Sequence, residues 1–230
     1  MNGIITMLRA SVFTNKAIAF TPDRAKEVCA LFQKEDLLVI INNNPFVLQN
    51  SPVLEWSLQS IDKSLVINFS FNKIDIIKNI QIDNNVSEEM FLSFIKEKIC
   101  SLMKKCNFDI LRIAFAPSYV ISLDVFSEFS NKVFKKNQFS ESKISECSFS
   151  TTFVRNEIIN NESVSINFCC NVSTIKDINN FENSDIKKIF ANIDINTSQN
   201  EKRNYNKEFV KEFFTKAKKY NSDFFNYYFN

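Results

Sequence analysis

The sequence predicts an α+β protein in which antiparallel sheets are covered by about four helices. Some segments alternate apolar and polar residues, which is the period of a half-buried strand, and others repeat apolar residues at helical spacing. Apolar residues make up 45% of the 230, enough to form a core. The length suits one domain spanning 1–230, with two fused lobes, 1–106 and 107–230, as the alternative.

The first half reads as a strand, a helix, several strands and a second helix. Thr21 followed by Pro22 is typical of a helix start. The continuous apolar run 37–41 predicts a buried strand, and two alternating segments around a short polar link predict a hairpin. In order, we expect a strand at 3–14, a helix from 22 to about 32, strands at 37–41, 53–59, 64–71 and 73–80, and a helix from 87 to about 104.

The second half repeats this order, which predicts two similar strand-helix-strands-helix halves. Asn-Asn pairs stand where turns are expected, because Asn tolerates the left-handed backbone region and the chain has one glycine, Gly3. In order, we expect a strand at 108–116 ended by Pro117, a helix from Ser122, strands at 144–157, 163–174 and 188–196 of which the first two form a hairpin, and a helix from about 207 to 220.

Two absences exclude common kinds of active site. The chain has no histidine, so it lacks an imidazole base for Ser-His-Asp or Cys-His catalysis and any histidine metal ligand. A single glycine cannot form the glycine-rich loops that bind phosphates. The sequence therefore indicates no catalytic residue, no metal ligand and no cofactor, and it favours a protein that is not an enzyme.

Charge and cysteine content predict a cytoplasmic protein. The net charge is +2, and no segment approaches the roughly 20 apolar residues that a membrane-spanning helix needs. The cysteines show no C-x-x-C spacing, which is typical of free thiols in a reducing compartment. Cys169 and Cys170 are adjacent in an expected strand, so their side chains should point to opposite faces.

Three stretches resemble an uncharacterised, sporadically distributed prokaryotic protein family. They are the segment Trp56–Ile77, the helix-strand passage 91–115, and the end of the chain, where I-D-I-N-T at 193–197 precedes a helix with widely spaced Phe. The resemblance lies in the layout of elements and brings no catalytic motif. It implies a bacterial or archaeal cytosolic protein of α+β build, and it suggests a link to antiviral defence because such families often accompany defence systems.

Carboxylates are the remaining candidates for catalysis. Glu141 and Lys143 form an E-x-K pattern with Asp124 upstream, an arrangement that holds a divalent metal in restriction-type nucleases. The alternative is that all three are ordinary surface charges. Asn192, Asp194 and Asn196 share one face of an expected strand, either as a ligand site or as its solvated face.

The final helix carries a basic face. Lys207, Lys211 and Lys218 lie together on it, so this face could contact nucleic acid, or it could be a solvated face whose lysines pair with nearby glutamates.

The chain then ends in five aromatic residues, which either cover the protein's own core or dock on a partner protein or a second copy: Phe224, Phe225, Tyr227, Tyr228 and Phe229. We therefore expect a non-enzymatic binding or assembly subunit that forms a homo-oligomer or binds a protein partner. A nucleic-acid-acting protein is the alternative.

Overall fold

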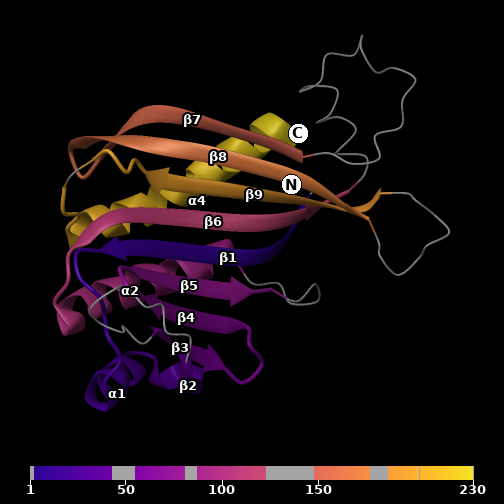
Figure 1. Ribbon diagram of the computed structural model, residues 1–230. Coiled ribbons are helices and arrows are strands. Elements are labelled where there is room, and N and C mark those ends of the chain that lie inside the picture. The colour runs from indigo at the N-terminus through magenta and orange to yellow at the C-terminus, as the bar shows by residue number, and fades with distance from the viewer. Residues whose placement is uncertain are drawn as a thin grey trace, which may run out of the picture.

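The computed structural model contains one nine-stranded antiparallel sheet with three helices among its described residues, which are 3–42, 55–80, 87–122, 148–176, 186–201 and 203–229 (Figure 1). The predicted α+β class is confirmed, with one sheet in place of several. The helix expected from Ser122 lies outside the described residues. Across the sheet, the strands follow the order β2-β3-β4-β5-β1-β6-β9-β8-β7.

The element bounds match most of the expected segments. The strands are β1 (Gly3–Thr14), β2 (Leu37–Asn42), β3 (Glu55–Ser60), β4 (Leu65–Ser70), β5 (Lys73–Asn79), β6 (Ile110–Ile121), β7 (Ser148–Ile159), β8 (Glu162–Lys176) and β9 (Ile186–Thr197). The described helices are α1 (Pro22–Leu31), α2 (Glu88–Cys106) and α4 (Lys207–Phe229), with a short 3-10 turn at Gln33–Glu35.

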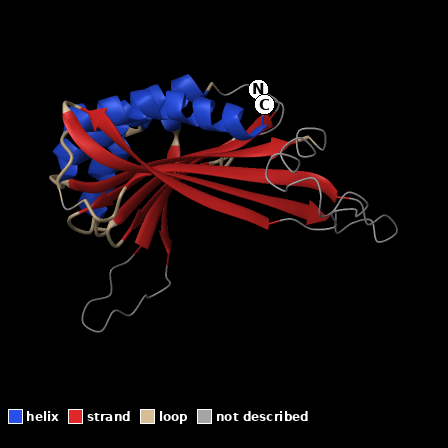
Figure 2. Cartoon of the chain, turned by 90° about the horizontal axis from the view of Figure 1, so that it is seen from above, coloured by secondary structure: helices blue, strands red, loops and turns tan. Residues whose placement is uncertain are grey.

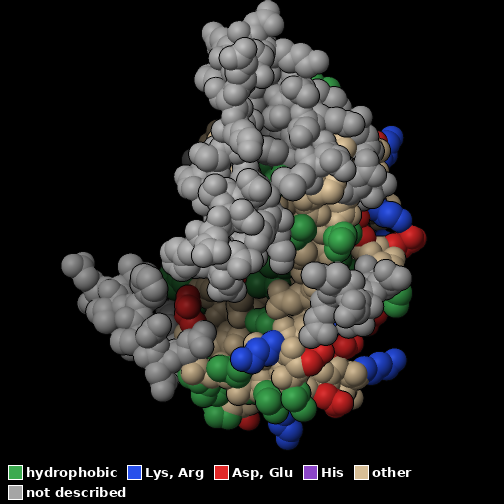
Figure 3. All heavy atoms as spheres, turned by 90° about the vertical axis from the view of Figure 1, so that its right-hand side faces the viewer, with side chains coloured by type: hydrophobic (Ala, Val, Ile, Leu, Met, Phe, Trp, Pro, Cys, Tyr) green, Lys and Arg blue, Asp and Glu red, His purple; other side chains and the backbone are tan. Residues whose placement is uncertain are grey.

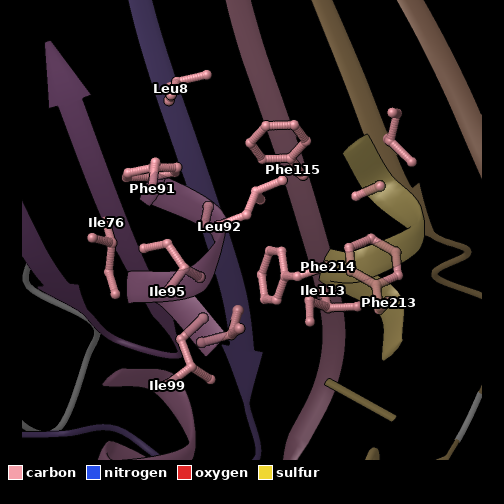
Figure 4. Close-up of a cluster of buried hydrophobic side chains, with 14 of the residues drawn as sticks. Leu8, Ile76, Phe91, Leu92, Ile95, Ile99, Ile113, Phe115, Phe213 and Phe214 are labelled. Carbon is pink, nitrogen blue, oxygen red and sulfur yellow. The ribbon is translucent and has the colours of Figure 1, made fainter. Parts of the chain in front are cut away.

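All three described helices lie on one face of the sheet (Figure 2). The core fills the space between them and the strands, where α2 contributes Phe91, Leu92, Ile95 and Ile99 and α4 contributes Phe213 and Phe214 (Figure 4). Facing strand residues such as Leu8 and Phe115 are fully buried. We call the opposite side of the sheet, which no described helix covers, the open face.

Local sequence signals explain several boundaries. The hydroxyl of Thr21 accepts a hydrogen bond from the Arg24 N–H at 3.1 Å, so Thr21 caps α1 as expected. Asn160 and Asn161 have φ values of 51° and 61° and form the tight turn between β7 and β8, which confirms that hairpin. Gly3 is required by packing, because a Cβ there would lie 2.8 Å from the Phe225 ring.

Three expectations about individual segments are wrong. The strand at 37–41 is not buried: it is the edge strand β2, and residues 38–41 are exposed on both faces because an apolar run is buried only where other elements cover it. The strand expected at 64–71 ends at Ser70, because Phe71 lies in a turn and is 50% exposed. Pro117 does not end β6; the missing N–H is tolerated because the β6–β9 ladder skips Ala116 and Pro117.

The two predicted halves meet at the centre of the sheet. The first strands of the halves, β1 and β6, pair with each other, and the last strand of each half, β5 or β9, pairs with its own first strand. The remaining strands follow outward in reverse order on both sides. The order of elements is thus similar in the halves, and the division into separate lobes stays a prediction.

Candidate binding surfaces

The C-terminal aromatic residues belong to α4, which continues to Phe229 and not only to the expected 220. Phe225, Tyr228 and Phe229 are buried, and the Phe225 ring lies 4.6 Å from that of Tyr119 on the sheet. Phe224 is half-buried, whereas Tyr227 is 73% exposed. The five residues predicted to bind a partner therefore divide between the chain's own core and its surface.

The less buried aromatics line a concave apolar site of about 310 Å³ between α4 and the strands β7 and β8. We call it the aromatic notch. Phe153 on β7 is 46% exposed, and its ring lies 6.1 Å from the ring of Phe224. The notch is lined by Phe153, Arg155, Phe168, Tyr220, Asp223, Phe224, Tyr227 and Tyr228. It can accept an apolar or aromatic group of a size typical of small-ligand sites.

Charged groups at the rim of the notch are held in place by their neighbours. The Arg155 guanidinium lies 5.1 Å from the centre of the Phe168 ring and pairs with Glu157. The Tyr220 hydroxyl donates to Glu157 at 2.9 Å. Burial, together with the adjacent carboxylate, raises the pKa of Tyr220, so this hydroxyl stays a hydrogen-bond donor at neutral pH. The rim therefore offers an oriented guanidinium beside apolar rings.

The open face carries polar side chains in register on β8 and β9. Cross-strand partners there are Asn167 with Asn196, Cys169 with Asp194, and Asn171 with Asn192, and we call these six residues the amide rows. The sequence predicted the polar face of each strand separately, but not that the two faces would lie side by side. Asn171 and Asn192 are exposed, whereas Asn196 is buried and hydrogen-bonded to Asn167 at 3.0 Å.

Two arginines flank the amide rows on the central strands. Arg112 on β6 donates to the Asn196 side-chain oxygen at 2.8 Å and lies 5.0 Å from the ring of Phe13. Arg9 on β1 lies opposite Ala116, and its buried Nε has no hydrogen-bond partner among the described residues. Amides and guanidinium groups on one face can donate and accept several hydrogen bonds to a polar ligand.

An open groove of about 740 Å³ adjoins the amide rows at the end of β9. Asn167 and Ser165 form its sheet side, and the segment Ser198–Glu201 forms the opposite side with Arg203. The Glu201 carboxylate accepts from the Ser165 N–H at 2.7 Å, which fixes this segment against β8. The groove extends the polar surface beyond the strand ends.

The predicted nucleic-acid-binding lysines lie on α4 beside acidic residues of α2 and of α4 itself. Lys218 pairs with Glu89 at 2.8 Å, which lowers the pKa of Glu89 and raises that of Lys218. Lys211 lines a groove between α2 and α4 together with Glu208 and Glu212. Lys207 is half-buried at the start of the helix. This face is therefore mixed in charge, and its contact with nucleic acid stays a prediction.

The remaining predicted sites concern catalytic carboxylates, metal ligands and membrane-spanning segments. Asp124, Glu141 and Lys143, the nuclease alternative, lie outside the described residues. Among the described residues, no group of three or more Cys, Asp or Glu side chains could hold a metal ion. Within the same residues, no helix is long and apolar enough to cross a membrane.

Comparisons with known proteins include a distant structural likeness. No protein-family model matches the chain, and no curated protein matches it. A solved structure of a rolling circle replication initiator protein from Geobacillus stearothermophilus is similar, with 10% identity and a TM-score of 0.34 over 99% of this chain and 85% of that one. A likeness at that level identifies no activity of the present chain. The resemblance to a sporadically distributed prokaryotic family stays a prediction.

Proposed function

We propose that the chain is a non-enzymatic binding subunit that docks a protein partner in the aromatic notch. The observation that supports this most directly is a concave apolar site whose walls include the exposed rings of Phe153 and Tyr227. Exposed aromatics around a cavity are a typical setting for an interface hot spot, where one inserted side chain contributes much of the binding energy. A role in an antiviral defence complex stays a prediction.

The chemistry of the notch specifies what the partner should present. Its rings favour an aromatic or branched aliphatic side chain, and Arg155 and Asp223 at the rim can bond to polar groups beside it. Because Phe225 and Phe229 are already buried in the core, they stabilise α4 rather than contact a partner. Among the C-terminal aromatics, the less buried Phe224 and Tyr227 therefore carry the proposed contact, and the buried Tyr228 forms part of the notch wall.

The test is affinity capture of the native complex with the wild-type chain, followed by measurement of how tightly the purified captured protein binds wild type and Phe153→Glu. A charge in the notch should weaken binding about 30-fold or more, the loss that accompanies removal of a hot spot. Ile158→Glu is the matched control, because Ile158 is 57% exposed on the same strand and faces the opposite side of the sheet. Equal binding by both variants would contradict the notch as the docking site.

The open face supports a second candidate function, the binding of nucleic acid. Asn and Arg are side chains that often read base edges, and here the exposed Asn171 and Asn192 lie on the same face of the sheet as Arg112 and Arg9. Ala114 and Ala116 on β6 are buried and lie between Arg9 on β1 and the amide rows, so no bulky side chain of that strand separates them. This assigns the alternative function to the sheet instead of to α4.

Titration of single-stranded and duplex oligonucleotides against salt tests this candidate. Binding should fall steeply with salt, and Arg112→Gln should reduce the slope by about one if it contacts a phosphate. Lys218→Gln, which alters the basic face of α4, should leave binding unchanged. If Lys218→Gln weakens oligonucleotide binding and Arg112→Gln does not, the basic face of α4 is the binding surface. If the wild type shows no salt-dependent binding, neither surface binds nucleic acid.

A further inference from the structure

The two strands at the ends of the described sheet, β2 and β7, differ in the side chains along their edges. β7 carries Arg155 and Glu157 and several hydroxyl side chains, which are features that discourage pairing with another chain. β2 has no charged or hydroxyl side chain from Leu37 to Ile41. It is the last strand of the described sheet and pairs on one side only, with β3. Among the residues that the structure describes, nothing pairs with the backbone N–H and C=O groups of its outer edge.

The side chains from Leu38 to Ile41 on β2 are apolar and exposed on both faces of the sheet. Leu38 and Ile40 on the open face are 56% and 36% exposed, and Val39 and Ile41 on the helix side are each 41% exposed. Figure 3 shows hydrophobic side chains gathered at the lower end of the molecule, where Figure 1 places β2 and β3. An apolar edge of this kind is the usual template for strand addition.

We propose that β2 pairs with β2 of a second copy of this chain, antiparallel about a two-fold axis at Val39. This register places Val39 opposite itself, Leu37 opposite Ile41, and Leu38 opposite Ile40, so every contact is apolar and every pair shares a face. A slip of one residue would pair side chains on opposite faces. A slip of two in one direction would set the charged Asp36 against Ile40. The proposal goes beyond the notch and is independent of it.

Self-complementarity selects a second copy as the occupant. A two-fold interface uses the same patch twice, so it needs a segment whose residues match themselves in reverse, and this five-residue apolar run does. The axis is normal to the sheet, and it keeps the open faces of both copies on one side. The pair would form a continuous sheet with a joined open face and all described helices on the other side.

Sedimentation or light scattering of the full chain over a wide range of concentration tests the pairing. The interface is small, so the mass should rise twofold with increasing concentration. Val39→Lys should abolish this rise, because the axis brings the two lysines directly opposite. Val154→Lys is the matched control, since Val154 is 66% exposed on the opposite edge strand. Monomeric wild type at all concentrations, or unchanged association of Val39→Lys, would overturn the proposal.

A disulfide tests the register even if Val39→Lys does not fold. Directly opposed Cα atoms in antiparallel strands lie about 4.5–5.5 Å apart, within the range that a disulfide spans. Val39→Cys should therefore give a cross-linked dimer under mild oxidation, whereas wild type and Val154→Cys should not. Failure of Val39→Cys to cross-link, or cross-linking to a different protein, would reject self-pairing. Phe153→Glu should not change the self-association measured by sedimentation or light scattering. The test of β2 pairing is therefore independent of the test of the aromatic notch.

Discussion

The two faces of strands β8 and β9 have opposite chemistry although they share one backbone. On the helix-covered face, β8 presents Val164, Ile166, Phe168, Cys170 and Val172, and all of them are buried. On the open face, the same strand presents Ser165, Asn167, Cys169, Asn171 and Ser173. The period of two thus assigns stability to one side and hydrogen bonding to the other, so substitutions at adjacent positions should separate the two roles.

Cys169 and Cys170 give the largest expected difference. Burial raises the pKa of Cys170 from its ordinary 9.0 to about 12, which lowers its thiolate fraction about a thousandfold. Cys169 lies half-buried on the open face, where its sulfur accepts a hydrogen bond from Thr152. We expect Cys170 to be modified only on unfolding, and Cys169 to react in the folded protein.

Mass spectrometry after timed alkylation checks this difference. Cys169→Ser should remove one rapidly labelled site, whereas Cys170→Ser should leave the rapid labelling pattern unchanged. Reaction of both thiols at similar rates in the folded protein would mean that the two faces are not separated as described.

Ile193 and Asn192 test the same contrast through stability. Ile193 is fully buried on the helix-covered face, so Ile193→Ala should reduce the free energy of unfolding by about 2–5 kcal/mol. Asn192 is exposed on the open face, so Asn192→Ala should change it by less than about 0.5 kcal/mol. Urea denaturation of both variants measures the difference. Comparable losses would show that the open face also carries packing energy.

Pattern alone predicted most elements, because caps, alternation and helical spacing are local. Thr21 and Pro22 marked the start of α1, and the alternation of 163–174 marked β8 with the correct faces. The burial of 37–41 could not be predicted from local sequence. An apolar run becomes buried only if other elements cover it, and this one forms the last strand of the described sheet. Pro117 likewise depended on where the neighbouring strand stops pairing.

The candidate surfaces were only half predictable for the same reason. The C-terminal aromatics stood out in the sequence, but their division between core and notch depends on the helix continuing to Phe229. Phe153 belongs to the strand expected at 144–157, but nothing local indicated that α4 would leave it 46% exposed beside Phe224. The amide rows required the β8–β9 register, which is a contact between distant segments.

The helix-covered side also contains polar groups, and their titration gives the smallest of the expected effects on stability. Asn221 on α4 is fully buried and donates to the hydroxyl of Tyr119 and to the carboxylate of Glu88 at the start of α2. Desolvation raises the pKa of Glu88 above its ordinary 4.5, and the hydrogen bond from Asn221 opposes this only in part. The charged form of Glu88 is therefore disfavoured in the folded protein.

The sign of the pH dependence follows from proton binding. Between pH 4.5 and the raised value, folded Glu88 holds its proton more than the unfolded chain does, so its contribution to stability falls as the pH rises. Glu88→Gln keeps an acceptor for Asn221 and removes this titration. Urea unfolding at several pH values should show that the free energy of unfolding of Glu88→Gln increases relative to that of wild type as the pH rises above 4.5. A difference that shrinks with rising pH would mean that Asn221 and Lys218 stabilise the charge of Glu88 enough to outweigh its burial.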